Sequence, residues 1–486
     1  MEQPLLDPRE VVGLDEPAPL LDGRWVRYVN LDNAATTPAL RSVVDAVHDL
    51  LPIYSSVHRG TGYKSRATTA AYEAARRQVG AFVGADPDRD AVMFVKHTTD
   101  AVNTLARSLV LAPDSVVLTT MLEHHSNDLP WRARTRVVHV AARPDGTLDD
   151  DDLDRQLARW AGRIGLVAVT GASNVTGVVP PVHDLAARVH AAGGRILVDA
   201  AQLAAHRPID MRPHDDPGHL DFVVLSAHKT YAPFGTGALI GRRDGFGPTP
   251  HHPGGGTVRA VTVDDVLWAP LPDREEGGSP NVVGAVAQAA ATERLAEIGL
   301  DRIAAHERAL AGDVASRLAA VAGVRLHGPA FGTADRVGVV PFTVPGLDPG
   351  YVAAVLGYEH GIGVRSGCFC AQPYIAHLLD LTPADVLGAA RTGGVPGAVR
   401  VSLGAYNGRA DLDRLVAAVE QVVAGAVRGR YVQGPDGQWA PVAYREPQRR
   451  QRVVRKNGSG GPPGPGVHGG SSVASSVKPP AVTVLR

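Results

Sequence analysis

The chain has 486 residues, which is long enough for two or three domains and a sizeable core. Its 49 basic and 50 acidic residues give a net charge of -1, which offers no electrostatic reason to expect nucleic acid, an anionic membrane or a polyanionic substrate. The first ten residues lack the basic and apolar regions of a signal peptide, and no run of about 18 apolar residues occurs, so we expect a soluble, cytoplasmic protein.

The amino-terminal part of the chain divides into a lead-in and a large domain. Residues 1–27 are polar and rich in proline, and we expect them to be loosely held. Residues 28–300 alternate short Val, Ile and Leu runs with helical patterns, which is typical of an α/β domain with a mostly parallel sheet flanked by helices. The predicted strands are Ala91–Val95, Val116–Thr119, Val137–Val140, Leu166–Thr170, Ile196–Val198 and Phe222–Leu225. The predicted helices are Thr68–Phe82, Ala101–Ser108, Val182–Ala192 and Val283–Ile298.

After residue 300 the pattern changes to that of a smaller α+β domain, which we place at residues 301–430. Its predicted helices are Asp301–Ala322, Pro349–His360 and Asp411–Ala424. Its predicted strands are Val324–Leu326, Val337–Thr343 and Val399–Leu403. Residues 431–486 include a basic run and a long Gly, Pro and Ser stretch that cannot bury enough apolar surface to order itself, so a disordered tail is predicted.

Lys229 stands at an unusual place for a solvated charge. It closely follows the apolar run Phe222–Leu225 and precedes a turn that contains two glycines. A partly desolvated lysine amine loses its proton more readily and can form a Schiff base with a carbonyl cofactor. The alternative is a surface lysine that opens a loop, and Lys229 alone does not separate the two.

Two other predicted strands are followed by residues that suit a phosphorylated ring. Thr98 and Thr99 open the helix after Ala91–Val95, and hydroxyls with free backbone N–H groups at a helix start bind phosphate. Asp199 ends the apolar run Ile196–Val198, where a carboxylate beside a pyridine ring would hold the ring nitrogen protonated. A plain helix cap is the alternative for each.

Further polar residues complete the pattern. Gln202 follows Asp199 at a distance suited to bonding the ring hydroxyl. One imidazole of the pair His124 and His125 can stack on a flat cofactor while serving as an acid or base, with ordinary loop histidines as the alternative. A lysine, an aspartate, a stacking histidine and a phosphate site are together what pyridoxal phosphate (PLP) needs. The sequence therefore predicts a PLP site.

The only two cysteines of the chain are Cys368 and Cys370. Two cysteines one residue apart form no disulfide framework, and they supply too few ligands for a structural zinc site. No metal site is predicted. The two remaining interpretations are a pair of small buried residues and a reactive thiol, and composition alone leaves both open.

These motifs resemble those of a known family. The chain is similar to class-V, fold-type I PLP enzymes, and within them to cysteine desulfurases and selenocysteine lyases, from about Tyr28 to Ala424. The resemblance implies the fold-type I architecture, with a large PLP-binding domain and a smaller carboxyl-terminal domain. The motifs that carry it are Leu31–Thr37, Val57–Gly60, Glu123–Asn127, Ser173–Val175, Asp199–Gln202, Ser226–Lys229, Gly278–Asn281 and Arg400–Leu403.

For the cofactor, the resemblance implies that Lys229 forms the Schiff base and shuttles the Cα proton, while His124 stacks on the ring and Asp199 pairs with its nitrogen. Asn174 and Gln202 would hold the ring hydroxyl side. The implied phosphate contacts are Thr98, Thr99, Ser226, His228 and, across a dimer interface, Ser279. A homodimer with composite active sites is therefore expected.

For the reaction, Cys370 matches the persulfide-forming cysteine of one desulfurase branch. Its thiolate would attack the sulfur of the substrate and leave L-alanine and a Cys370 persulfide. Arg400 would bind the substrate carboxylate in a bidentate fork, with Asn174 nearby and Arg365 favouring the thiolate or that carboxylate. We therefore expect a PLP-dependent cysteine desulfurase that acts on L-cysteine or selenocysteine and passes the sulfur to a protein acceptor.

The sequence also departs from that branch. Cys368 and Phe369 stand where the branch carries two histidines, and the Cys-Phe-Cys run is similar to molybdenum-cofactor sulfurases. One hypothesis is that Cys368 accepts sulfur from Cys370. The alternative functions are another class-V activity that does not use Cys370, such as an isopenicillin N epimerase or a C–S lyase, and a sulfur-carrier scaffold that has lost its cofactor.

Overall fold

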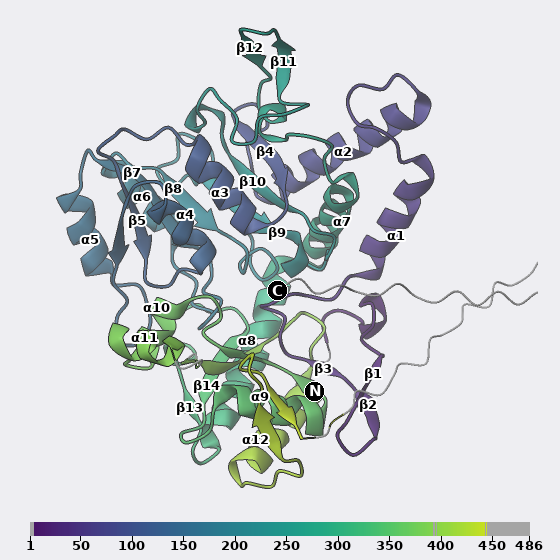
Figure 1. The fold of residues 1–486 in the computed structure, drawn as a ribbon, viewed down its shortest axis with the longest axis vertical. Coiled ribbons are helices and arrows are strands. Elements are labelled where there is room, and N and C mark those ends of the chain that lie inside the picture. Colours follow the sequence, from purple (N-terminus) through teal and green to yellow (C-terminus); the bar gives the residue numbers. More distant parts are fainter. Residues whose placement is uncertain (1–3, 392–393, 395, 443, 445–486) are drawn as a thin grey trace, which may run out of the picture. The chain divides into compact units, whose positions relative to one another are not determined.

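A seven-stranded sheet dominates the first 300 residues of the computed structural model, which describes residues 4–391, 394, 396–442 and 444 (Figure 1). The strand order is β4-β10-β9-β8-β7-β5-β6, and every pair is parallel except the two that β10 makes. The strands are β4 (Asp90–Val95), β5 (Val116–Thr120), β6 (Arg136–Val140), β7 (Ile164–Thr170), β8 (Ile196–Asp199), β9 (Phe222–Ser226) and β10 (Gly237–Arg242). The predicted mostly parallel α/β architecture is confirmed.

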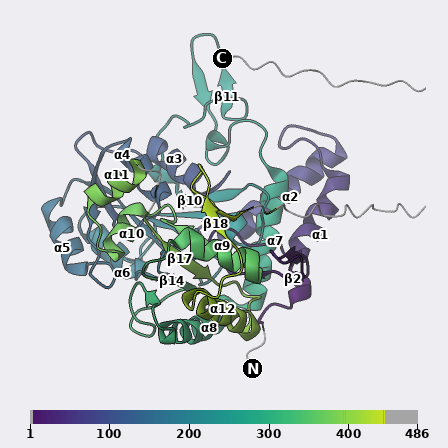
Figure 2. The ribbon, with the colours of Figure 1, turned by 60° about the horizontal axis from the view of Figure 1, so that its bottom comes forward.

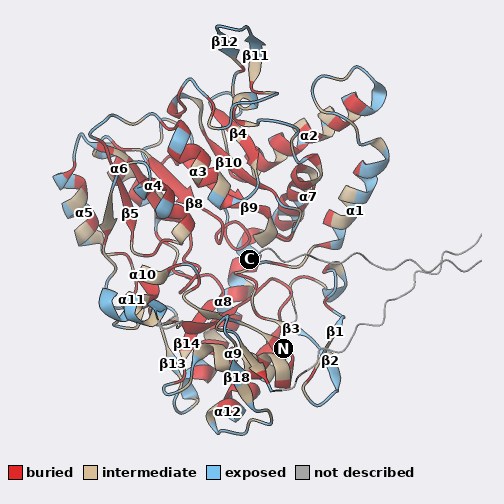
Figure 3. Cartoon of the chain, in the orientation of Figure 1, coloured by how far each residue is buried: buried red, intermediate tan, exposed pale blue. Residues whose placement is uncertain are grey.

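Helices cover both faces of this sheet, because successive side chains of a strand point to opposite faces. In β9, Val223 and Leu225 belong to the same apolar cluster as α2, α5, α6 and α7, whereas Val224 packs with α3 and α4. Strands β5, β8 and β9 in the middle of the sheet are consequently buried along their whole length, whereas the edge strand β6 is only partly buried (Figure 3). The helices of this part are α1 (Arg41–Leu50), α2 (Tyr63–Phe82), α3 (Thr98–Ser108), α4 (Leu129–Arg132), α5 (Asp150–Arg159), α6 (Val182–Ala191) and α7 (Val282–Ile298).

A second, four-stranded antiparallel sheet follows, in the order β13-β14-β17-β16. Its apolar side chains form a separate core with α8, α9 and α12, which lie against it in Figures 1 and 2. The strands are β13 (Arg325–Leu326), β14 (Val339–Thr343), β16 (Arg365–Gly367) and β17 (Ala398–Ser402). The helices are α8 (Leu300–Ala320), α9 (Pro349–His360), α10 (Gln372–Leu378), α11 (Pro383–Arg391) and α12 (Arg409–Val423). The described residues of both sheets lie within one compact unit, residues 1–445, so the domain boundary at residue 300 stays a prediction.

The amino-terminal segment is held more firmly than the sequence suggests. Leu6, Val11 and Leu14 are buried in a cluster with α1 and α7, and the backbone N–H of Leu6 donates to the carbonyl oxygen of Ala405 at 3.1 Å. Short strands β1 (Pro17–Pro19) and β2 (Trp25–Arg27) form a hairpin, and β3 (Val29–Asn30) pairs with β15 (Ile362–Gly363). The prediction of a loosely held lead-in is therefore wrong: spaced apolar residues anchor a segment whose average composition is polar.

The predicted tail also begins too early. Residues 431–441 contain the hairpin of β18 (Tyr431–Gln433) and β19 (Trp439–Pro441). Tyr431 and Trp439 pack edge-on against Tyr351 of α9, at centroid distances of 5.5 and 5.4 Å. Aromatic contacts thus order a stretch whose polar composition had led us to predict disorder. The rest of the predicted tail, residues 445–486, lies outside the described residues.

The remaining elements were not predicted. They include β10 and the hairpin of β11 (Val258–Val261) and β12 (Val266–Trp268), which is seen near the top of Figure 1. Strand β10 begins at Gly237, the last residue of the glycine-containing turn predicted after Lys229. Within the described ranges, no helix is both long enough and apolar enough to cross a membrane.

Candidate active site

A cavity of about 340 Å³ lies at the carboxyl edge of the large sheet, where β4, β5, β7, β8 and β9 all end. Parallel strands bring the residues after their carboxyl ends to one edge, which is where open α/β sheets bind ligands. The small sheet supplies the remaining wall through β17 and the β16–α10 segment. The predicted site residues that line this cavity are Thr98, Thr99, His124, Asn174, Asp199, Gln202, Ser226, His228, Lys229, Arg365, Cys370 and Arg400.

Hydroxyl groups gather at the amino-terminal end of α3, as the predicted phosphate site requires. The Ser226 hydroxyl accepts from the Thr98 backbone N–H and donates to Thr98 Oγ1, both at 2.8 Å. Thr99 Oγ1 lies 2.6 Å from Ser126 Oγ. The helix cap is His97, whose Nδ1 accepts from Asp100 N–H, so Thr98 is the first helical residue and not the cap. The hydroxyls and the positive end of the helix dipole therefore fit an anion.

Lys229 and Asp199 are the charged pair at the centre of the sheet edge. Burial lowers the pKa of Lys229 to about 8, and the nearby charge of Asp199 works against that decrease. At pH 7 about one amine in ten is then neutral and nucleophilic. Burial raises the pKa of Asp199, whose Oδ1 accepts from Ala201 N–H at 3.0 Å. Among the described residues the carboxyl group of Asp199 has no other hydrogen-bond partner, so its second oxygen is available to a protonated ring nitrogen.

His124 has a neutral imidazole ring, and its hydrogen bond shows which ring nitrogen carries the proton. Burial, followed by the charge of Lys229, lowers its pKa to about 3. Its Nδ1 accepts a hydrogen bond from Ser126 N–H at 3.0 Å, so the single ring proton is on Nε2. A neutral ring at the cavity wall fits the predicted stacking role. His228 is neutral as well, since burial and Lys229 lower its pKa to about 4.

Glu123 supports the His124 segment and was given no role from the sequence. Its carboxyl group accepts from the Thr120 hydroxyl at 2.6 Å, from the Asn127 amide at 2.7 Å and from Thr170 N–H at 2.9 Å. Burial raises its pKa to about 8, and the charge of Asp199 adds to the increase. Glu123 is therefore mostly protonated at neutral pH, and it fixes the segment that presents His124.

Cys370 is exposed and lines the cavity from the segment between β16 and α10. Phe369 and Cys370 both have φ of +54°, a left-handed conformation that costs roughly 1–2 kcal/mol for each residue other than glycine. Hydrogen bonds to the large sheet hold them there. The Asn174 side-chain amide donates to the Phe369 carbonyl oxygen at 2.7 Å, and His125 N–H donates to the Cys370 carbonyl oxygen at 2.7 Å. His125 Nε2 also accepts from Gln372 N–H at 3.1 Å.

The amide groups of Asn174 and Gln202 have protein partners in this structure. Asn174 Nδ2 bonds Phe369, as above, and Gln202 Nε2 donates to the Ala34 carbonyl oxygen at 2.6 Å. Their predicted contact with the ring hydroxyl therefore has to use the side-chain oxygens or replace these bonds. Both residues line the cavity, and their cofactor role stays a prediction.

Arg400 is buried and mostly committed to protein partners. Its Nη1 donates to the Asn174 carbonyl oxygen at 2.9 Å and its Nη2 to Asp32 Oδ1 at 3.1 Å, while Nε has no partner among the described residues. The guanidinium stacks on the Phe369 ring at 4.8 Å. Burial lowers its pKa to about 10, so it stays charged at neutral pH. The predicted bidentate grip on a substrate carboxylate therefore has to use Nε–H and the N–H groups of Nη1 and Nη2 that Asn174 and Asp32 leave free.

Asp32 is the second residue that the sequence interpretation missed. Its Oδ2 pairs with Arg365 at 2.8 Å and its Oδ1 with Arg400 at 3.1 Å, so one carboxylate bridges the two predicted substrate-binding arginines. The residue stands in a quoted motif, but its arginine partners are more than 300 positions away. No local pattern links residues at such a separation.

Ser279 is the one predicted site residue that lies elsewhere. It is exposed in a different cavity, of about 680 Å³, together with His58, Arg59 and Glu276. The single chain therefore does not bring Ser279 to its own phosphate site. The predicted contact with the phosphate of a partner subunit stays a prediction.

Comparisons with known proteins agree with this site. A family model described as aminotransferase class-V matches residues 29–415. A cysteine desulfurase of Haloferax volcanii is 34% identical over 399 residues, which cover 81% of this chain and 88% of the relative. The apo structure of a cysteine desulfurase from Thermococcus onnurineus NA1 is similar with a TM-score of 0.76 and 30% identity, covering 87% of this chain and 99% of that one. The cysteine desulfurase CsdA of Escherichia coli, in its S-sulfonic acid form, gives a TM-score of 0.72 at 28% identity, covering 87% and 100%.

Proposed function

The chain belongs to the class-V aminotransferase family of PLP-dependent enzymes, and we propose that it is a cysteine desulfurase that uses Cys370 as its sulfur acceptor. The observation that carries the proposal is that Lys229 and Cys370 line one cavity together with Arg400. A PLP lysine alone would suit many reactions of this family. An exposed thiol that faces the same cavity is what a sulfur-transfer reaction needs in addition.

The residues on the sheet side of the cavity fit PLP. The hydroxyls at the start of α3 would hold the phosphate, Asp199 the ring nitrogen, and Lys229 the carbonyl carbon. When bound, PLP draws electrons away from the substrate and makes its Cβ–S bond labile. Asp199 contributes by keeping a positive charge on the ring nitrogen, because a buried carboxylate with one free oxygen favours a protonated neighbour.

Lys229 is the residue suited to moving the Cα proton. With a pKa near 8 it exists in both protonation states at neutral pH, so it can take a proton from one carbon atom and return it to another. His124, which is neutral with its proton on Nε2, can donate a hydrogen bond but carries no charge at pH 7. A neutral ring leaves the positive charge of the site on Lys229 and Arg400.

Cys370 would complete the reaction. Its thiolate attacks the sulfur of L-cysteine, a new S–S bond forms, and the Cβ–S bond breaks with its electron pair left on the substrate carbon. That carbon takes up a proton and the product is L-alanine, while the extra sulfur remains on Cys370 as a persulfide. Exposure of Cys370 then allows an acceptor protein to reach the persulfide. L-Selenocysteine would react in the same way.

Arg400, with Arg365, would select the substrate. Both are cations at the cavity wall, and Arg400 is buried with an unpaired Nε. A buried, unpaired donor favours a ligand that can accept its hydrogen bond, and an α-carboxylate does so. The proposal also includes a cytoplasmic homodimer in which Ser279 of each subunit meets the phosphate site of the other.

The experiment is to incubate the PLP-loaded protein with L-cysteine and a reductant and to identify the products. We expect L-alanine and sulfide in equal amounts, and a persulfide on Cys370 detected by mass spectrometry. Cys370→Ser should lower the rate at least ~100-fold with PLP still bound, whereas the matched control Cys368→Ala should keep it. Pyruvate as product would indicate a C–S lyase, and an epimerised substrate would indicate an epimerase. Either result with an unaffected Cys370→Ser variant overturns the proposal.

A further inference from the structure

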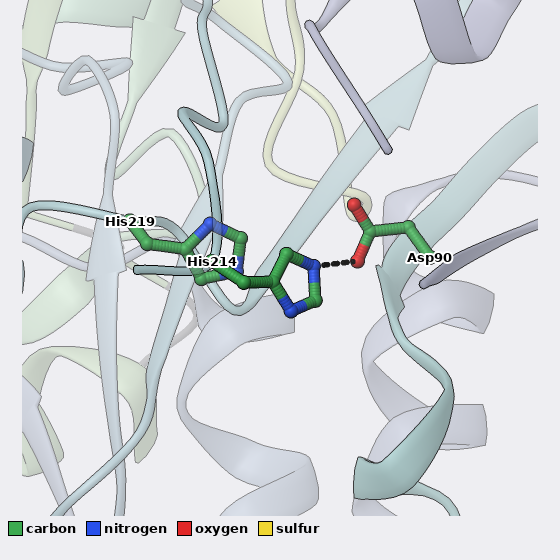
Figure 4. Close-up of side chains that lie close together, drawn as sticks. All are labelled: Asp90, His214 and His219. Atoms are coloured by element: carbon green, nitrogen blue, oxygen red, sulfur yellow. Dashed lines mark hydrogen bonds and ion pairs between the residues drawn. The ribbon is translucent and has the colours of Figure 1, made fainter. Parts of the chain in front are cut away.

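Three side chains with metal-binding atoms meet at the edge of the large sheet opposite the cavity. Asp90 is the first residue of β4, and His214 and His219 come from the segment between β8 and β9 (Figure 4). Because β9 runs from this edge to the cavity over five residues, roughly 15 Å of strand separates the cluster from Lys229. The cluster is therefore no part of the site described above.

The cluster is buried. The side chains of Asp90 and His214 are 1% and 3% exposed, and His219 is 1% exposed. His214 Nε2 lies 2.9 Å from Asp90 Oδ1, and the two imidazole rings are 4.2 Å apart between centroids. Buried polar atoms are normally hydrogen-bonded, so each unpaired one calls for an explanation.

Two ring nitrogens of the cluster are unpaired. His219 Nδ1 donates to the Arg212 carbonyl oxygen at 2.8 Å, so its Nε2 carries a bare lone pair. Neither His219 Nε2 nor His214 Nδ1 has a hydrogen-bond partner in the described part of the chain. Leaving such an acceptor unmatched costs about 1–3 kcal/mol.

The charged groups around the cluster that the structure describes make no hydrogen bond to His214 Nδ1 or His219 Nε2. Asp90 Oδ2 accepts from Asp86 N–H at 2.9 Å, which leaves Oδ1 for His214. The nearby Asp221 accepts through Oδ2 from His190 Nε2 and from Ile196 N–H, each at 2.8 Å, and its Oδ1 pairs with Arg242 Nη1 at 3.6 Å. The cluster is thus a preformed set of two imidazoles and one carboxylate oxygen.

We propose that Asp90, His214 and His219 bind a divalent transition-metal cation, of which Zn²⁺ fits the donor set best. Each residue offers one ligand atom, and these atoms all lie within 4.8 Å of one another. Tetrahedral Zn²⁺ with bonds of about 2.1 Å needs ligand atoms about 3.4 Å apart, so the widest pair has to close by at most about 1.4 Å. Two histidines and one carboxylate leave the fourth position to water.

A cation bound by these three residues would stabilise the folded chain. It would join the start of β4 to the segment 200–221, which leads into β9, the strand that ends three residues before Lys229. Asp90 and His214 are 124 positions apart, so no sequence motif marks the set, and the sequence predicts no metal site. A bond to metal that exists only in the folded chain stabilises it by mass action.

The test is Zn²⁺ binding by the PLP-loaded full chain after chelator treatment, measured by titration calorimetry. Both cysteines are first replaced, as Cys368→Ala and Cys370→Ser, so that exposed thiols contribute nothing. We expect one Zn²⁺ per chain with micromolar or tighter affinity, and a Co²⁺ absorption spectrum typical of tetrahedral nitrogen and oxygen ligands. His219→Ala should weaken binding at least ~100-fold.

The controls separate binding from folding. His139→Ala breaks a comparable pair, His139 Nε2 to Asp128 Oδ1 at 3.0 Å, which has no second histidine, and it should leave the affinity unchanged. Asp90→Asn is nearly isosteric and should weaken Zn²⁺ at least ~10-fold even if His219→Ala unfolds the chain. Equal Zn²⁺ affinity in the parent, His219→Ala and Asp90→Asn proteins overturns the proposal, as does a Co²⁺ spectrum of the hydrated ion. Neither result bears on the desulfurase assay.

Discussion

The cavity has two walls that are built in different ways. The first, which we call the sheet wall, consists of the strand-end residues of the large sheet, with Lys229, Asp199 and Thr98 among them. The second, the loop wall, consists of Cys370 and Arg400 and is carried by the small sheet. Strand pairing fixes the sheet wall, whereas a few hydrogen bonds hold two left-handed residues of the loop wall in place.

This difference matches what each wall has to do. A cofactor must be held in one orientation through the whole reaction, which a buried parallel sheet edge achieves. A sulfur carrier must reach the substrate and then offer its sulfur to another molecule, which requires an exposed residue. The comparison predicts that loss of Lys229 from the sheet wall abolishes all of the chemistry, that loss of Cys370 from the loop wall prevents sulfur transfer with PLP still bound, and that changes around Arg400 alter substrate binding.

The largest expected effect is on the sheet wall. Lys229→Ala should lower desulfurase activity at least ~1000-fold, because the substitution removes the amine that we propose both anchors PLP covalently and carries the Cα proton. Borohydride treatment should fix PLP on Lys229 in the parent and leave the variant unlabelled, as read by mass spectrometry. Lys96→Ala, an exposed lysine just after β4, is the control and should behave as the parent. If the Lys229→Ala variant is still labelled, Lys229 is not the residue that binds PLP covalently.

The next largest effect is expected on the free energy of unfolding of the chain, through the buried Glu123 beside the sheet wall. The pKa of Glu123 in the folded chain is about 8, above its ordinary value of 4.5, so between these pH values the folded chain keeps a proton that the unfolded chain loses. Its contribution to stability is therefore full below pH 4.5, falls as pH rises through the window and is flat above pH 8. Relative to Glu123→Gln, the parent should lose up to about 3 kcal/mol of unfolding free energy between pH 5 and pH 8.

Urea unfolding at the two pH values measures this difference. Glu420→Gln, an exposed glutamate of α12, is the matched control and should show no such change. Parallel pH profiles for the parent and Glu123→Gln would mean that Glu123 is ionised in the folded chain.

A smaller effect is expected in the loop wall. Asp32→Asn removes the carboxylate that orients Arg365 and Arg400, so the KM for L-cysteine should rise about tenfold, or about 1.4 kcal/mol, with a smaller change in kcat. Steady-state kinetics against the exposed control Asp45→Asn give the comparison. A lower KM would instead show that Asp32 competes with the substrate carboxylate for Arg400.

The smallest effect is expected at Cys368. Burial raises the pKa of this thiol, so little of it is thiolate at neutral pH, and a thiol is a poor nucleophile. Cys368→Ala should therefore change the rate of sulfur transfer to a reductant by less than about twofold. A larger loss would support the hypothesis that Cys368 accepts sulfur from Cys370.

The two walls also differed in how far the sequence alone predicted them. Asp199 and Lys229 stand at the ends of apolar runs, and the carboxyl ends of parallel strands share one edge, so a local pattern placed them together. For Cys370, composition alone favoured a small buried residue, and only the family resemblance indicated a reactive thiol. The bridge from Asp32 to Arg400 joins residues 368 positions apart, and only the folded chain makes it visible.

The prediction of the fold from local sequence patterns was limited in the same way. The predicted strands β5, β7 and β8 have apolar runs bounded by polar residues, and they are observed within two residues of the predicted bounds. Strand β10 was missed because Gly237 and Gly241 favour a turn in isolation, although both approach neighbouring strands too closely to accept a side chain. Contacts with neighbouring strands, and not the local preference of its glycines, therefore make this segment a strand.

The position of β10 has a consequence for biosynthesis. Strand β4 lies at the edge of the sheet and its neighbour there is β10, whose last residue, Arg242, comes 147 positions after Val95. A nascent chain emerging from the ribosome therefore carries an unpaired apolar β4 until residue 242 has been made, which is a long interval of exposure to aggregation. The central strands can pair earlier, but the hydrogen bond from Thr98 to Ser226 at the predicted phosphate site joins residues 128 positions apart and also has to wait for the later part of the chain.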